Sequence, residues 1–145
     1  MSPNLNKQLH DKYPKLCENM NKSPQKTCFS FWCECDDGWF SLIDQLLGFI
    51  QGTVDSNHKY CKKGDAGYIE QIKVAQIKEK FGKLRIYIDN GSEEVIGAIL
   101  FAEYLSGFIC EECGSTKNVG TTTNFYIKTV CINCVKDIKN WKQNQ

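Results

Sequence analysis

The sequence predicts an α+β fold in which helices pack on a small, mostly antiparallel sheet, with a zinc ribbon appended at the C-terminus. Apolar residues recur at helical spacing in three segments, alternate with polar residues in a fourth, and precede two CxxC pairs near the end of the chain. With 145 residues, of which 41% are hydrophobic, the chain is long enough to form a core. We therefore expect an α+β core domain over residues 1–107 and, over residues 108–145, a four-cysteine zinc ribbon with a short closing helix.

Three helices are expected in the core domain. The first begins at Ser2-Pro3, because proline suits the first helical position, and it ends near Pro14. The second follows an N-cap in Asp36-Asp37-Gly38, and the third runs from a cap at Ser92 to Ser106-Gly107. The apolar stripes of these helices and the expected strands supply the predicted core, which comprises Leu5, Leu9, Phe31, Trp39, Ile43, Leu46, Leu47, Leu84, Ile86, Val95, Ile99 and Leu105.

Two segments have the alternation of β-strands. Cys28 to Cys35 is rich in aromatic residues and cysteine, so we expect a short strand with both faces buried. Ile69 to Asp89 contains two alternating runs around Phe81-Gly82, which predicts a hairpin, or a strand, a bulge and a strand. The polar stretch from Gln51 to Gly67 has no periodicity, and we expect a flexible loop or a variable insertion there.

Charge and hydropathy bear on which partners and which cellular compartment we expect for the protein. The formal net charge is +1, so there is no overall basic field that would indicate nucleic-acid binding. The longest apolar stretch, Val95 to Ala102, is eight residues, whereas a membrane-spanning helix needs about 20. The first residues lack an apolar signal core, so we expect a cytoplasmic protein that does not enter a membrane. In that compartment the nine cysteines are expected to be thiols or metal ligands.

Two CxxC pairs give the strongest chemical signal. Cys110 and Cys113 form the first pair, Cys131 and Cys134 form the second, and 17 residues separate Cys113 from Cys131. A two-residue spacing allows a tight turn that directs both sulfurs at one ion, and Gly114 relaxes the backbone after the first pair. Four thiolates complete a tetrahedron, so we expect one structural Zn²⁺ per chain with no open position for catalysis.

No motif of a catalytic centre is recognisable, and we expect a protein that is not an enzyme. The sequence contains no phosphate-binding glycine loop, no nucleophile elbow and no HExxH motif. Glu34, Asp36 and Asp37 offer the ligands for Mg²⁺ in a nuclease-like site, with helix capping as the simpler explanation. A second metal site, with buried unliganded thiols as the alternative, stays open for Cys33, Cys35, His58 and Cys61.

The second alternating run predicts a binding surface. On a strand, Lys83, Arg85 and Tyr87 share one face, and a cationic and aromatic face suits phosphate, nucleobase or carboxylate recognition. The alternative is a solvated face on which Arg85, the only arginine, pairs with Glu79.

The segment after the last cysteine is expected to form the closing helix, docked through Trp141. Lys136 and Lys139 would lie on its other faces and offer a basic strip to phosphate. Because 17 of the 18 basic residues are lysine, which is typical of a low-GC coding bias, lysine abundance alone is a weak argument.

Several of these segments, taken in order, resemble a family of small and mostly uncharacterised phage and prophage proteins. The resemblance covers nearly the whole chain and is most specific at the Lys-Glu-Lys-Phe-Gly-x-Leu-Arg motif, residues 78–85. The sequence departs from the family pattern at Asp36, Ile86 and Tyr126, and the stretch 51–67 is peculiar to this chain. The further segments that carry the resemblance are Lys12–Leu16, Cys35–Phe40 with Leu42-Ile43, Ala75–Ile77, Ile86-Tyr87, Ala102-Glu103 and Cys110–Gly114.

The resemblance implies an accessory gene of a mobile element, acting in the cytoplasm of a host bacterium. Small phage proteins without catalytic motifs commonly bind host macromolecules, so we expect a non-enzymatic inhibitor of a host defence effector, of the anti-CRISPR type. Its partner would be a host defence protein or ribonucleoprotein, with a possible RNA contact. The alternatives are a nucleic-acid-binding zinc-ribbon accessory or regulatory protein and a metal-dependent nuclease.

Overall fold

The computed structural model describes residues 1–123 and 125–144 and has an α+β fold. Over these residues it contains three α-helices, α1 (Pro3–Lys12), α2 (Phe40–Tyr60) and α3 (Glu93–Ser106), and two three-stranded sheets. The first sheet consists of β1 (Cys33–Glu34), β2 (Lys73–Lys80) and β3 (Lys83–Asp89), and the second of β4 (Val119–Thr122), β5 (Thr129–Cys131) and β6 (Trp141–Gln143). Short 3₁₀ turns span Glu18–Asn21, Cys28–Phe31, Asp37–Trp39 and Ile138–Asn140.

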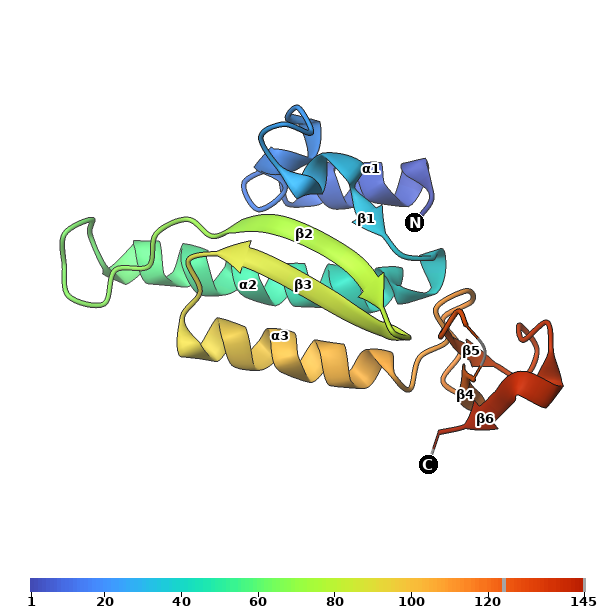
Figure 1. The fold of residues 1–145 in the computed structure, drawn as a ribbon. Coiled ribbons are helices and arrows are strands. Elements are labelled where there is room, and N and C mark those ends of the chain that lie inside the picture. The colour runs from blue at the N-terminus through green and yellow to red at the C-terminus, as the bar shows by residue number, and fades with distance from the viewer. Residues whose placement is uncertain (124, 145) are drawn as a thin grey trace.

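The first sheet is built on the predicted hairpin. β2 and β3 are antiparallel, with a bulge between Val74 and Gln76, and the two-residue β1 pairs with β2 in parallel. Ser92 caps α3 by accepting a hydrogen bond from the backbone N–H of Val95, as the sequence predicts. Figure 1 shows α2 behind the hairpin and α3 alongside it, so the opposite face of the sheet is left open.

The core lies between the sheet and the helices and contains most of the predicted residues. Leu5 and Leu105 are only half-buried, and the prediction for Phe31 is wrong, because its side chain is 63% exposed. Cys28–Phe31 is a 3₁₀ turn, not a strand, and Trp32 follows it with a φ of 64°. That left-handed residue breaks the alternation, so Phe29 is buried in place of Phe31. Nine predicted residues are buried, namely Leu9, Trp39, Ile43, Leu46, Leu47, Leu84, Ile86, Val95 and Ile99.

α2 is longer than predicted and includes most of the stretch expected to be a loop. It continues to Tyr60, and Val54 within that extension is fully buried. The returning chain holds the last turns of the helix: the Asn57 side chain bonds the backbone of Gly67 and Ile69, and the His58 ring stacks on Tyr68. Only the part after Tyr60 lacks regular structure.

α3 covers the outer edge of β3. The backbone N–H of Leu84 donates to Ser106 Oγ at 2.9 Å, and that of Ile86 donates to Glu103 Oε1 at 3.0 Å. An edge strand has unpaired N–H groups, and these side chains satisfy two of them. The edge of the sheet is thereby closed by a helix instead of by a fourth strand.

The second sheet has the order β5-β4-β6 and is antiparallel throughout. β4 and β5 return the chain from the first cysteine pair to the second, and β5 ends at Cys131. The predicted closing helix is wrong, because Ile138–Asn140 is a single 3₁₀ turn and Trp141 begins β6. The Trp141 indole N–H still docks on the carbonyl oxygen of Val130, at 3.0 Å. None of the helices in residues 1–123 and 125–144 combines the length and apolarity needed to cross a bilayer.

Candidate metal centre

The four cysteines predicted to bind zinc converge on one point. The sulfur atoms of Cys110, Cys113, Cys131 and Cys134 all lie within 4.8 Å of one another. The Sγ atoms of Cys113 and Cys131 are 3.6 Å apart. In tetrahedral zinc sites with Zn–S bonds of about 2.3 Å, sulfurs are separated by about 3.8 Å. The cluster is therefore compatible with one metal ion held by four thiolates.

Each CxxC pair is a tight turn closed by backbone hydrogen bonds. The N–H of Gly114 donates to the carbonyl oxygen of Cys110 at 2.8 Å, and the N–H of Cys134 donates to that of Cys131 at 3.0 Å. Gly114 has a φ of 76°, a conformation that a residue with a Cβ rarely adopts. These turns aim the two sulfurs of each pair at the same point, so the positions of the ligands follow from the local sequence.

The chemistry of the donor set fits zinc. Burial would by itself raise the pKa of Cys131, but the backbone of Asn133 and the neighbouring Cys113 and Cys134 thiols lower that pKa to about 7. By contrast, burial raises the pKa of Cys110 and, together with the neighbouring thiols, that of Cys134. A thiol with a lowered pKa readily supplies the thiolate that a metal requires. Four protein ligands leave no position for water, so a zinc ion held here would stabilise the fold and would not activate a substrate.

The first cysteine turn packs directly against the loop that precedes α2. The backbone N–H of Gly38 donates to the carbonyl oxygen of Glu111 at 2.7 Å, and the Trp39 indole N–H donates to that of Ile109 at 2.9 Å. The segment before the second cysteine pair contacts the tip of the hairpin. There Thr129 Oγ1 donates a hydrogen bond of 2.5 Å to the carbonyl oxygen of Gly82. The cysteine cluster is thus tied to both α2 and the first sheet.

Glu111 is a buried carboxylate that the sequence reasoning missed. Its Oε1 accepts a hydrogen bond from the backbone N–H of Asp36 at 3.1 Å, while Oε2 has no partner among the described residues. Burial raises the pKa of Glu111 to about 7. Nothing in a CxxC motif indicates that one of its intervening residues is buried, so only the fold identifies this position.

The two other candidate metal sites do not form in the part of the chain that the structure describes. Among the described residues, the four-cysteine cluster is the only group of ligands close enough to share an ion. The candidates that stay apart are the carboxylates of Glu34, Asp36 and Asp37 and the set Cys33, Cys35, His58 and Cys61. The Glu34 carboxylate accepts from Gln76, that of Asp36 pairs with Lys128, and that of Asp37 accepts from the backbone of Ser2. Cys33 begins β1, Cys35 follows it, and both are buried. His58 and Cys61 lie at the C-terminal end of α2, where His58 Nε2 is 2.7 Å from the Ile69 carbonyl oxygen.

The predicted strand face exists and is larger than predicted. Lys83 and Tyr87 are exposed, and Arg85 is half-exposed and lies 3.4 Å from the Glu103 carboxylate instead of pairing with Glu79. The cross-strand register places Lys78 opposite Arg85 and Lys80 opposite Lys83, so β2 adds two cations to the same face. We refer to Lys78, Lys80, Phe81, Lys83, Arg85 and Tyr87 as the hairpin face.

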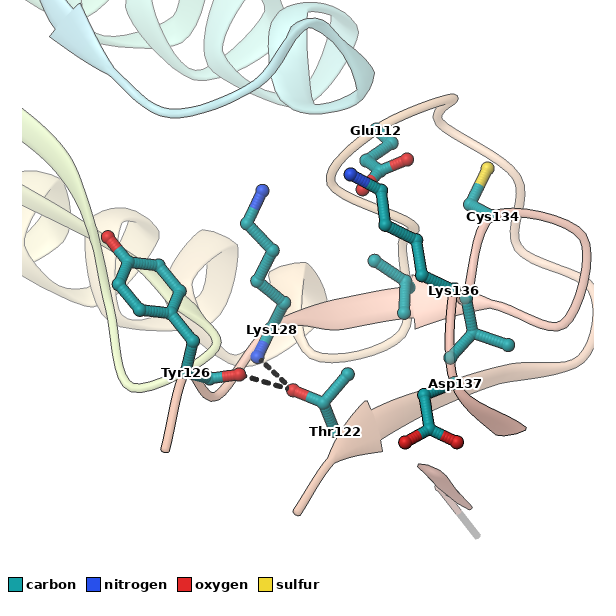
Figure 2. Close-up of a pocket in the computed structure, with 9 residues that line it drawn as sticks. Glu112, Thr122, Tyr126, Lys128, Cys134, Lys136 and Asp137 are labelled. Carbon is teal, nitrogen blue, oxygen red and sulfur yellow. Dashed lines mark hydrogen bonds between the residues drawn. The ribbon is translucent and has the colours of Figure 1, made fainter. Parts of the chain in front are cut away.

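The two C-terminal lysines do not share a helix face. We refer to residues 108–123 and 125–144 as the C-terminal lobe. Lys136 lines a cavity of about 220 Å³ in this lobe, where its side chain extends toward Glu112 (Figure 2). Lys139 lies in the exposed 3₁₀ turn that replaces the predicted helix. They do not form the continuous basic strip that a helix would have given.

Comparisons with protein-family models, with curated proteins and with solved structures found no match to this chain. The functional interpretation therefore depends on the cysteine cluster and on the hairpin face.

Proposed function

We propose that the protein is a non-enzymatic phage or prophage accessory protein that binds and inhibits a host defence ribonucleoprotein, of the CRISPR effector type. The hairpin face is the binding surface in this proposal, and the resemblance to phage proteins supplies the host-defence setting. The four-cysteine centre has the structural role of holding the C-terminal lobe against the hairpin tip through Thr129 and Gly82.

One observation carries the proposal: the hairpin places like charges directly opposite each other twice in succession. Lys78 is the cross-strand partner of Arg85, and Lys80 is that of Lys83. Like-charged residues at such positions repel each other and destabilise a sheet. Glu103 offsets part of this repulsion at Arg85, and Glu34, the β1 neighbour of Lys78, offsets part of it at Lys78. An anionic partner would neutralise the rest, which makes a phosphate-bearing surface the best-fitting ligand.

The hairpin turn carries a second unfavourable feature at the same surface. Phe81 and Gly82 have φ values of 53° and 76°, the signs that a type I′ turn requires. Asparagine and glycine favour this turn, whereas an aromatic residue at positive φ is strained. Phe81 is nevertheless 72% exposed and gains no core contact in return.

The aromatic rings of the face lie among its cations. The ammonium group of Lys80 is 5.7 Å from the centre of the Phe81 ring, and that of Lys78 is 5.6 Å from the centre of the Tyr87 ring. Exposed rings beside cations on an open sheet suit the stacking of unpaired bases along a phosphate backbone. The RNA component of a ribonucleoprotein offers both groups.

The proposal is tested by affinity purification of the protein from a host that carries a CRISPR system, with and without RNase, together with a plasmid-protection assay. We expect the wild type to retain the effector and to protect the plasmid. Lys80→Ala/Lys83→Ala should lose both activities, while the control Lys15→Ala/Lys62→Ala, which removes the same charge from exposed positions elsewhere, should lose neither. Retention of free RNA alone, with steep salt dependence, would instead indicate a general nucleic-acid-binding protein.

A stability measurement separates a binding role from a structural one. Phe81→Asn creates an Asn-Gly turn and should raise the free energy of unfolding by about 1 kcal/mol through relief of strain. The same variant should retain less effector, because it removes a stacking ring. A variant that is more stable and binds as well as the wild type would exclude Phe81 from the interface.

A further inference from the structure

α3 is apolar on the side that faces solvent as well as on the side that faces the core. Val95, Ile99 and Ala102 are buried against the core. On the outer side, Leu100 and Phe101 are 60% and 61% exposed, and four more apolar positions share that side. A surface helix of a monomeric protein ordinarily presents polar residues to water. The outer stripe, as we call it, consists of Ile96, Gly97, Leu100, Phe101, Tyr104 and Phe108.

The outer stripe is continuous along the whole helix. Ile96, Leu100 and Tyr104 follow one another at intervals of four residues within α3, which places them on one face, and Phe108 extends the stripe two residues beyond the helix end at Ser106. The ring centres of Tyr104 and Phe108 are 5.2 Å apart. With side chains of roughly 200 Å² each, the exposed fractions leave roughly 500 Å² of apolar surface in water, near the upper end for a monomer.

The two ends of the outer stripe carry opposite charges. Glu93 and Glu94 are exposed at the start of α3. At the other end, Lys83 and Lys142 line a cavity of about 500 Å³ together with Tyr104 and Phe108. A two-fold axis through the middle of the helix would bring the acidic end of one copy to the lysine end of the other, twice. A second copy of the chain therefore complements this surface in both polarity and charge.

Gly97 lies in the second turn of α3, next to Ile96 in the outer stripe, and leaves room for a close approach. A Cβ added at Gly97 would meet no atom within 4 Å, so the position is open within one copy. Glycine weakens a helix relative to alanine, and here no contact inside the chain requires it. Between two helices, however, a glycine lets the backbones come together.

We propose that two copies of the protein pair antiparallel along α3, burying the outer stripe about a two-fold axis. The stripe contributes roughly 1,000 Å² from both copies, and the charged ends add the remainder of an interface of the size that specific complexes bury. Lys83 belongs both to the hairpin face and to the lysine end of the stripe. The variants that test the dimer therefore change other residues, so that its failure and the failure of the proposed function are distinguishable.

The first test measures molecular mass by sedimentation equilibrium over a range of protein concentrations. We expect a monomer–dimer equilibrium for the wild type, and for Phe101→Glu a dissociation constant at least tenfold higher. Phe31→Glu is the matched control, because Phe31 is 63% exposed in the 3₁₀ turn Cys28–Phe31, outside α3 and outside the C-terminal lobe, and this variant should dimerise like the wild type. A wild type that stays monomeric at 100 µM (about 1.7 mg/ml), or that forms larger open assemblies, would overturn the proposal.

Two further variants test the geometry without relying on a charge in the stripe. Gly97→Gln should raise the melting temperature of the monomer, because it strengthens the helix, and should weaken the dimer at least tenfold. Glu94→Lys and Lys142→Glu should each weaken the dimer, and the combination should restore it, because it rebuilds the pairing with reversed signs. A dimer unaffected by Gly97→Gln, or additive weakening in the combined charge variant, would overturn the antiparallel arrangement.

Discussion

The backbone N–H of Gly38 donates a hydrogen bond to the carbonyl oxygen of Glu111 at 2.7 Å, which places the loop before α2 in backbone contact with the first cysteine turn. A Cβ on Gly38 would lie only 2.5 Å from the carbonyl oxygen of Glu111 and from the backbone nitrogen of Gly114. Both neighbours are main-chain atoms that the cysteine turn fixes in position. Only glycine allows this approach, so residue 38 links the packing of the core to the geometry of the metal centre.

Gly38→Ala should therefore destabilise the whole protein, by about 3 kcal/mol or more, because the clash is with backbone and cannot be relieved by a rotamer change. Gly52→Ala is the control: Gly52 lies in α2 with no atom within 4 Å of an added Cβ, and we expect a gain of about 0.5–1 kcal/mol there. Urea unfolding of both variants measures the effect. A Gly38→Ala protein as stable as the wild type would show that the two segments are not in contact.

One zinc ion should bind per chain, and Cys113→Ser should reduce the zinc content below half an equivalent, because a serine hydroxyl is a poor replacement for a thiolate. The C-terminal lobe buries a small apolar cluster of its own, so metal binding should supply much of its folding free energy. Elemental analysis and thermal melts measure both effects, and Cys28→Ser, at an exposed cysteine outside the cluster, should change neither. Wild-type protein purified without chelator and holding under half an equivalent would refute this assignment.

The five cysteines outside the cluster should differ sharply in reactivity. Burial raises the pKa of Cys17 and of Cys35 to about 12 and raises that of Cys33 as well, so these thiols are protonated and shielded at neutral pH. Cys28 is exposed and Cys61 is partly exposed. Native, zinc-loaded protein treated with a maleimide should be labelled at Cys28 and Cys61, and at the other three only after unfolding, as peptide mass spectrometry would show. Rapid native labelling of Cys33 would contradict the buried placement.

The features that sequence alone predicted are those fixed by short-range chemistry. Ser92 caps α3, Phe81-Gly82 turns the hairpin, and the CxxC spacings bring the sulfurs together, because each depends on residues a few positions apart. The pairing of Arg85 with Glu103 and the burial of Glu111 depend on elements far apart in the chain. No local pattern contains that information.

The errors have a common physical cause, which is tertiary contact overriding local propensity. The polar end of α2 is helical because Asn57 and His58 bond the chain that returns past them. The segment after Cys134 has an apolar spacing that fits a helix, yet Trp141 pairs as a strand with β4, where its indole meets the Val130 carbonyl oxygen. The C-terminal end of α2 finds hydrogen-bond partners in residues 67–69, and the edge of β4 finds them in β6.

The Glu18 carboxylate should make the free energy of unfolding depend on pH between about pH 4.5 and pH 2. Its two oxygens accept hydrogen bonds from Lys22 at 2.6 Å and from Lys73 at 2.7 Å, and these bonds lower the pKa of Glu18 to about 2 from its usual 4.5. Because the folded-state pKa is the lower one, the stabilisation is present in full above about pH 4.5 and is lost as the pH falls toward 2. Glu18→Gln should therefore be less stable than the wild type at pH 7, by an amount that shrinks below pH 4.5.

Urea unfolding of the wild type and Glu18→Gln from pH 7 to pH 3 measures this difference, and loss of zinc at low pH, which is common to both proteins, cancels in it. The Glu18 carboxylate is exposed to solvent, so added salt should reduce the difference at pH 7. Lys73→Gln should remove part of the same pH dependence, because Lys73 joins Glu18 to β2. If the difference in unfolding free energy between Glu18→Gln and the wild type stays constant from pH 7 to pH 3, the charge of the Glu18 carboxylate contributes nothing to stability. The 3₁₀ turn Glu18–Asn21 would then be held on β2 by the Asn19 side chain, which donates to the Val74 carbonyl oxygen at 3.1 Å.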